Sequence, residues 1–328
     1  MTKTDAFRIA ICIGLMFLSA KTLDAQMKSA DNAKVITISN NELLVNISTY
    51  GAELQNIISQ KTNHEYLWQG NPEYYSRHAP ILFPFIGRLW EGGYNLDGKR
   101  YSMMGHGFAK DEIFELAKKD DSEAWFKLTS NKQTMEIYPF PFELTIGYIL
   151  ENNRLKVVWD VKNTGNAEMY FMIGGHPAFN YPDFDKKDRY HTYLGFDQIS
   201  EVLSYVNKDS TGYLNPDRTA NVISLDNDGL FPVSQELFKK DAVIFENYQA
   251  RKVTMYDKNK NKYLAIEFDM PVFTLWSSPN KKAPFICIEP LYGRIEEYNF
   301  IKDMRHREWT QNVSPGERFL TSHEIAIF

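Results

Sequence analysis

The first candidate for chemistry is His176, which stands in the stretch MIGGHPAFNYP at residues 172–182. The two glycines before it permit close approach of the chain or of a ligand, and Pro177 favours an extended conformation at His176. Imidazole titrates near neutral pH, so a histidine held in one direction can donate or accept a proton. A packing role is the common alternative for a histidine beside an apolar strand, and at this point both roles stay open.

Glu289 is the second candidate, because it interrupts an apolar run in APFICIEPLYGR and is followed at once by Pro290. A carboxylate in a buried strand is costly unless it is paired or used in catalysis. A salt bridge to an arginine such as Arg294 is the purely structural alternative. In the functional alternative, Glu289 accepts a proton as a general base.

Two further stretches place ionisable groups among prolines, glycines and aromatics. Residues 75–93 (YSRHAPILFPFIGRLWEGG) contain Arg77, His78 and Arg88, and residues 105–116 (GHGFAKDEIFEL) contain His106 between two glycines. Arginine and histidine donors suit hydroxyl, carboxylate or phosphate ligands. These residues are therefore candidates for substrate binding.

Metal and nucleotide chemistry are not indicated by the motifs. The sequence has no HxH, HExxH or CxxC pattern, so we predict no catalytic metal. It also lacks a GxSxG elbow, a P-loop and a GxGxxG loop, and no cofactor is expected. Cys287 lies within the apolar run before Glu289, where a small buried hydrophobic role is expected.

Composition does not suggest nucleic acid as a partner. The formal net charge is −5, and no basic stretch provides the positive face that phosphate backbones require. The aromatic content of 14% can supply a large core. The expected partner is a small molecule. The sequence carries no signal for the oligomeric state.

The N-terminal residues 1–25 resemble a secretory signal peptide. They combine Lys3 and Arg8 with an apolar run from Ile9 to Leu18 and then small residues, with cleavage expected after Ala25 or, as the alternative, after Ala20. The apolar run is shorter than the roughly 20 residues that span a bilayer, so no membrane insertion is expected after cleavage. We therefore expect an exported protein, periplasmic or extracellular, without an intramolecular disulfide.

The rest of the chain has the pattern of antiparallel strands. Short runs of β-branched and aromatic residues alternate with turns, and the predicted strand pairs cover 34–48, 94–103, 154–175 and 251–269. Asp97-Gly98 suits a two-residue hairpin, and the best helical stretch is a short one near 234–240. These features predict an all-β fold, a large antiparallel β-sandwich in a single domain over residues 33–328.

Six stretches together resemble one known family. They are GAEL, EYLW, APILFPFIGRLW, GHGFAKDEIFEL, IGGHPAFN and PFICIEPLYG, in this order across residues 51–294. Their succession is similar to that of the aldose 1-epimerase (galactose mutarotase) family, in particular its LacX-like branch. The resemblance implies the supersandwich form of the β-sandwich and a cofactor-free isomerase that interconverts the α and β anomers of a free aldohexose such as galactose or glucose.

The resemblance also implies roles for particular residues. His176 matches the family's general acid and Glu289 its general base, and His106, Arg77 and Arg88 match substrate-binding positions. The family also uses an aspartate for sugar hydroxyls, and Asp241 in KKDAVIFEN is the matching choice. This chain has Lys110 where relatives often have arginine, which puts in doubt any role of that position in holding an anionic substrate.

Three alternatives accompany the mutarotase hypothesis. A carbohydrate-binding protein without catalysis would not need both His176 and Glu289. A hexose-6-phosphate 1-epimerase is disfavoured by export and by Lys110. The third alternative is a glycosidase or polysaccharide lyase; a hydrolase would require a second carboxylate at a set spacing, whereas the candidates here are a histidine and a glutamate.

Overall fold

The computed structural model describes residues 32–184, 191–198, 203–207, 211–214 and 220–328, and its regular structure consists almost entirely of antiparallel strands. The predicted signal segment at residues 1–25 lies outside the described residues. Within the described part of the chain, no helix has both the length and the apolar character needed to cross a membrane. The predicted all-β fold is confirmed.

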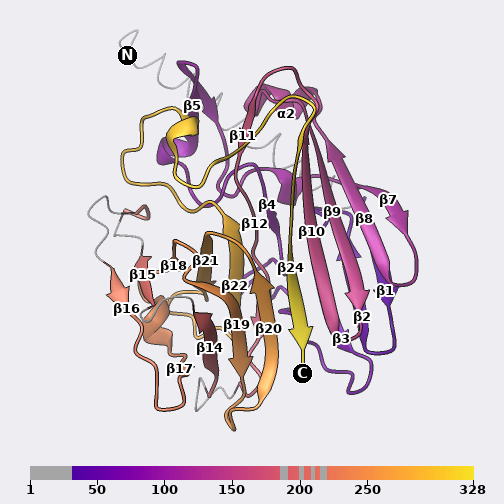
Figure 1. Ribbon diagram of the computed structural model, residues 1–328, viewed down its shortest axis with the longest axis vertical. Helices are drawn as coiled ribbons and strands as arrows, with labels where there is room; N and C mark the ends of the chain where they lie inside the picture. The colour runs from indigo at the N-terminus through magenta and orange to yellow at the C-terminus, as the bar shows by residue number, and fades with distance from the viewer. Residues whose placement is uncertain (1–31, 185–190, 199–202, 208–210, 215–219) are drawn as a thin grey trace, which may run out of the picture.

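The larger of the two large sheets has nine strands and extends across the molecule (Figure 1). Its order is β17 (Phe231–Pro232), β14 (Tyr193–Gln198), β19 (Ala250–Tyr256), β20 (Lys262–Phe268), β24 (Arg318–Ile327), β10 (Arg154–Asn163), β9 (Phe142–Glu151), β8 (Glu123–Thr129) and β7 (Glu115–Lys119).

The second sheet has eight strands and carries the candidate catalytic residues. Its order is β16 (Asn221–Val222), β15 (Ser204–Asn207), β18 (Val243–Phe245), β21 (Val272–Trp276), β22 (Phe285–Tyr292), β12 (Ile173–Gly175) and β4 (Ile81–Leu82), and β13 (Ala178–Asn180) also pairs with β22.

Small sheets and short helices complete the described structure. The sheets are β1 (Val35–Ser39), β2 (Leu43–Ser48) and β3 (Leu54–Ser59); β5 (Gly93–Leu96) with β6 (Lys99–Ser102); and β11 (Met169–Phe171) with β23 (Gln311–Val313). The helices are α2 (Lys132–Ile137) and the 3-10 turns η1 (Trp90–Gly92), η2 (Ala109–Asp111), η3 (Gln235–Phe238) and η4 (Met304–His306).

The core lies where the two large sheets face each other. On β10 every second side chain is buried, and Trp159 is 0% exposed. A Cβ at Gly175 of β12 would lie 3.2 Å from the Trp159 ring, so the absence of a side chain lets β12 lie close to β10. Complete burial of such a large apolar side chain stabilises the fold by roughly 1.5–3 kcal/mol.

Three of the four predicted strand pairs are confirmed and one is wrong. β1 pairs with β2, β5 with β6 and β19 with β20, and the β5–β6 turn has Asp97 and Gly98 at φ 49° and 74°. β10 and β11, predicted as a pair about Gly165, instead pair with other strands. β9 and β24, each ten residues long, pair with the two edges of β10. Neither edge is therefore open to the three-residue β11.

Candidate active site

His176 lies between β12 and β13, opposite Glu289 on β22. β12 pairs Gly174 with Leu291, and β13 pairs Ala178 with Cys287, so both segments follow one register along β22. Because that register continues through the residues between them, His176 stands across from Glu289, where side chains on one face meet. The His176 Nε2 and Glu289 Oε1 atoms are 3.4 Å apart, and the two side chains are 9% and 5% exposed.

The two glycines before His176 serve the packing of β12. A Cβ at Gly174 would overlap the side chain of Leu291 on β22, and Gly175 lies against Trp159. On the other edge, the His176 N–H donates to the carbonyl of Pro80 at 3.1 Å. The close approach expected from the glycines is thus to protein groups, which hold the histidine backbone between two strands.

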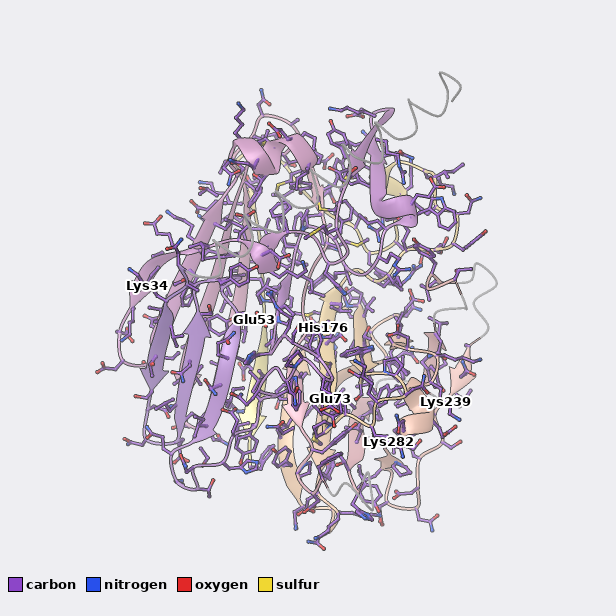
Figure 2. The ribbon with its side chains drawn as sticks, turned by 180° about the vertical axis from the view of Figure 1, so that it is seen from behind. Lys34, Glu53, Glu73, His176, Lys239 and Lys282 are labelled. Atoms are coloured by element: carbon purple, nitrogen blue, oxygen red, sulfur yellow. The ribbon has the colours of Figure 1, made fainter. Side chains whose placement is uncertain are left out.

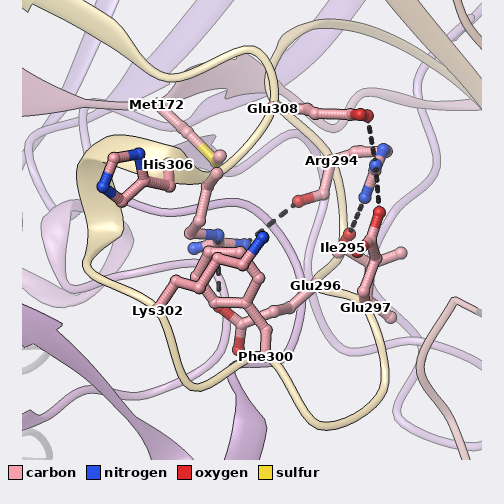
Figure 3. A pocket seen from close by; sticks show the side chains of 10 residues that line it. Met172, Arg294, Ile295, Glu296, Glu297, Phe300, Lys302, His306 and Glu308 are labelled. Carbon is pink, nitrogen blue, oxygen red and sulfur yellow. Dashed lines mark hydrogen bonds and ion pairs between the residues drawn. The ribbon is translucent and has the colours of Figure 1, made fainter. Parts of the chain in front are cut away.

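Arg294, the arginine suggested as a salt-bridge partner of Glu289, pairs with other carboxylates. The guanidinium of Arg294 pairs instead with Glu246 at 2.7 Å, Glu297 at 3.1 Å and Glu308 at 2.5 Å. Figure 3 shows the latter two ion pairs at the edge of a cavity beyond β22. These carboxylates, and not Glu289, therefore balance the charge of Arg294.

His106 approaches His176 from a turn between β6 and η2. Its ring centroid lies 5.7 Å from that of His176, and its backbone has a left-handed φ of 65°. A Cβ at the next residue, Gly107, would overlap the backbone of Phe83, so glycine is required there. The Gly87 N–H donates to His106 Nδ1 at 3.2 Å, which places the proton of the neutral ring on Nε2.

Two aromatic side chains fix the imidazole of His176. Tyr75 stacks on it at 5.4 Å between centroids, and Trp276 meets it edge-on at 5.5 Å. Burial, and to a smaller extent nearby acidic groups such as Glu289, raises the pKa of Tyr75 well above its usual value, so this hydroxyl stays neutral. The Trp276 indole N–H donates to Asp241 Oδ1 at 2.7 Å, which connects Asp241 to the group.

Arg77 is held by two carboxylates. Its guanidinium lies 2.9 Å from Glu53 and 3.3 Å from Asp111. Glu53 is 3% exposed and also accepts the backbone N–H groups of His78 and Ala79. Figure 2 labels Glu53 and His176 in the middle of the molecule. Glu53 therefore links Arg77 to the segment that leads into β4.

Arg88 lies apart from this cluster. Its side chain is exposed, and its guanidinium sits over the Tyr213 ring at 5.9 Å. Trp68 packs on Phe285, and Trp90 packs against Tyr213. Of these tryptophans and Trp276, Trp276 is the one with a described contact to His176.

Several residues of the site were not identified from the sequence. Glu53 lies in the GAEL stretch and Tyr75 two residues before Arg77, while Asp111 follows Lys110, whose ammonium group bonds to it. The signal for Glu53 was present, since it is a carboxylate between buried apolar residues. Asp111 carried no comparable signal, because charged residues of this kind are common on protein surfaces.

One group of potential metal ligands occurs in the described part of the chain. His176, Cys287 and Glu289 each offer one ligand atom, and these atoms all lie within 4.8 Å of one another. The search for short metal motifs in the sequence could not find this group, because His176 lies far along the chain from Cys287 and Glu289. Burial raises the pKa of the Cys287 thiol well above its usual range, with a further contribution from Glu289.

Comparisons with known proteins agree with this architecture. The family model described as aldose 1-epimerase matches residues 34–326. The chromosomal protein LacX of Lactococcus lactis subsp. lactis is 32% identical over 304 residues, which are 89% of this chain and 99% of that protein.

Solved structures give the same result. A galactose mutarotase related enzyme from Lactobacillus acidophilus has a TM-score of 0.82 and 33% identity, and the match covers 90% of this chain and 97% of that one. A galactose mutarotase-like protein from Lactobacillus casei has a TM-score of 0.85 and 29% identity, over 90% and 100% of the two chains. The chain therefore belongs to the aldose 1-epimerase family, in its LacX-like branch.

Proposed function

We propose that this protein is a mutarotase that interconverts the α and β anomers of a free aldohexose such as galactose or glucose. The observation that carries the proposal is the 3.4 Å separation of His176 Nε2 and Glu289 Oε1. The family supports an epimerase activity in general, and this pair supplies the two proton-transfer groups that ring opening needs.

Ring opening moves two protons. The Glu289 carboxylate takes the proton from the O1 hydroxyl while the His176 imidazolium gives a proton to the ring oxygen O5. The C1–O5 bond breaks, and a C1=O1 double bond forms. Rotation about C1–C2 followed by the reverse transfers gives the other anomer, and both side chains return to their starting states. The reaction requires a protonated histidine beside an ionised glutamate, so we expect a bell-shaped dependence of rate on pH.

The neighbouring side chains suit recognition of an uncharged sugar. The Nε2–H of neutral His106 is a donor for a ring or hydroxyl oxygen, and Asp241 is an acceptor for sugar hydroxyls. Arg77 is a rigid donor because Glu53 and Asp111 hold it. We assign Arg88 a weaker binding role, since it is exposed and stacks on Tyr213.

A free sugar fits the site better than a sugar phosphate. The Lys110 ammonium is bonded to Asp111, so its charge is already balanced. We also propose that residues 1–25 direct export, which would expose the protein to free sugars. Polarimetry of freshly dissolved α-galactose and α-glucose, each beside its 6-phosphate, tests this preference. Faster mutarotation of the phosphate would contradict it.

Two substitutions test the assigned pair. His176→Asn and Glu289→Gln should each lower the mutarotation rate by about 10²- to 10⁴-fold, with sugar binding still detectable by calorimetry. His306→Asn and Glu73→Gln are matched controls, because both residues are exposed and lie outside the cluster. Full activity of either site variant, or no acceleration of any common aldose by the unmodified protein, would refute the proposal.

A further inference from the structure

Three different kinds of ligand atom converge beside the proposed proton-transfer pair. Cys287 precedes Glu289 by two residues on β22, so both side chains point to the same face of the sheet. The imidazole nitrogen of His176, the sulfur of Cys287 and a carboxylate oxygen of Glu289 lie within 4.8 Å of one another. Cys287 pairs across the sheet with Ala178.

This set of atoms fits a small thiophilic cation. Zinc takes nitrogen, sulfur and oxygen ligands at about 2.0–2.3 Å, and catalytic sites often use three protein ligands with one open position. Tetrahedral ligands at these bond lengths stand roughly 3.3–3.8 Å apart, and the distance of 3.4 Å between His176 and Glu289 falls in this range. The sulfur of Cys287 lies within 4.8 Å of both of these atoms.

We propose that Zn²⁺, or the chemically similar Cd²⁺, binds to His176, Cys287 and Glu289 and reversibly inhibits the enzyme. This inference rests on the proposed function, because the ion would occupy the two side chains that move protons. The ion and the sugar would therefore compete for one place.

Binding must remove the thiol proton, which passes to the solvent as the metal–sulfur bond forms. Since burial raises the pKa of Cys287, the metal has to displace a proton that is firmly held. Each bound ion would thus release one proton from the Cys287 thiol and a second one wherever His176 carries the imidazolium proton used in catalysis. Hard cations such as Mg²⁺ prefer oxygen ligands, so their binding to sulfur would not offset the free energy needed to remove the thiol proton. They should therefore not inhibit.

The first measurement uses the full chain after removal of metals with a chelator. Cd²⁺ should produce the ultraviolet charge-transfer band of a cadmium–thiolate bond at one equivalent. Zn²⁺ should lower the mutarotation rate at least about tenfold, and added chelator should restore it. The inhibition should weaken as the sugar concentration rises. Absence of the band, or inhibition that is insensitive to sugar, would overturn the proposal.

Substitution of Cys287 tests whether the inhibitory ion binds at this site or elsewhere on the protein. Cys287→Ala, or Cys287→Ser if the smaller residue impairs folding, should lose the band and raise the inhibitory Zn²⁺ concentration at least about tenfold. Its mutarotation rate without metal should stay within about threefold of the original, because the thiol moves no proton in the reaction. Cys12→Ser is the matched control and should keep the band, since Cys12 is the other of the two cysteines in the sequence. Equal metal sensitivity of Cys287→Ala and the unmodified protein would refute the assignment.

The two proposals can fail separately. If no aldose is accelerated but the band appears and is lost in Cys287→Ala, the metal site stands and the mutarotase function is wrong. If mutarotation is found but the band is absent, the function stands and the metal site is wrong.

Discussion

His323 on β24 provides a quantitative test of the core packing next to the candidate site. It is 3% exposed and lies on the core side of β12, with its ring 5.0 Å from that of Trp159 and near Gly175. Its Nδ1 atom is buried without a hydrogen-bond partner among the described residues. Burial therefore lowers the pKa of His323 from 6.5 to about 3.

This pKa difference makes stability depend on pH. Between about pH 6.5 and pH 3 the unfolded chain binds a proton at His323 that the folded protein does not bind. The histidine's contribution is therefore fully favourable above pH 6.5 and is lost progressively as the pH falls towards 3. The linkage relation gives a loss of roughly 2 kcal/mol in the free energy of unfolding between pH 7 and pH 5.

Urea denaturation of the unmodified protein and of His323→Leu, each at pH 7 and at pH 5, measures this loss. The decrease between the two pH values should be smaller by about 2 kcal/mol in the variant. Because each protein is compared with itself, any packing cost of leucine cancels. The exposed His306 serves as a control, since His306→Leu should not alter the decrease. An equal decrease in His323→Leu and the unmodified protein would refute the assignment of a neutral, buried His323.

The remaining predictions concern the supports of the site. Trp276→Phe keeps a ring beside His176 but removes the hydrogen bond to Asp241, so KM should rise by about tenfold with a smaller effect on kcat, measured by polarimetry. Gly107→Ala should destabilise the fold by about 1–3 kcal/mol in thermal denaturation and lower activity, because it strains the turn that carries His106. Glu53→Gln should cost about 3 kcal/mol in urea denaturation, since it leaves Arg77 with one carboxylate. Unchanged KM in the first case, or unchanged stability in the other two, would contradict these roles.

Local signals predicted much of the fold. The Asp97-Gly98 hairpin forms as expected because a two-residue turn and its flanking strands are encoded within ten residues. The helix at Lys132–Ile137 was missed, although Asn131 caps it through the N–H of Thr134. Six residues are too few for a clear helical periodicity, and the helix forms because the cap and its surroundings stabilise it.

Sequence alone indicated which residues could carry chemistry, because a histidine before proline and a glutamate in an apolar strand are locally unusual. It could not establish that His176 and Glu289 meet, because their contact depends on β12 and β13 sharing one register along β22. Nor could it decide where Arg294 binds, or that Cys287 joins the pair, since those contacts come from strands distant in the chain. Residue types and alternation are local properties, whereas strand pairing depends on the whole sheet. Tertiary structure therefore decided which of the candidate side chains form one site.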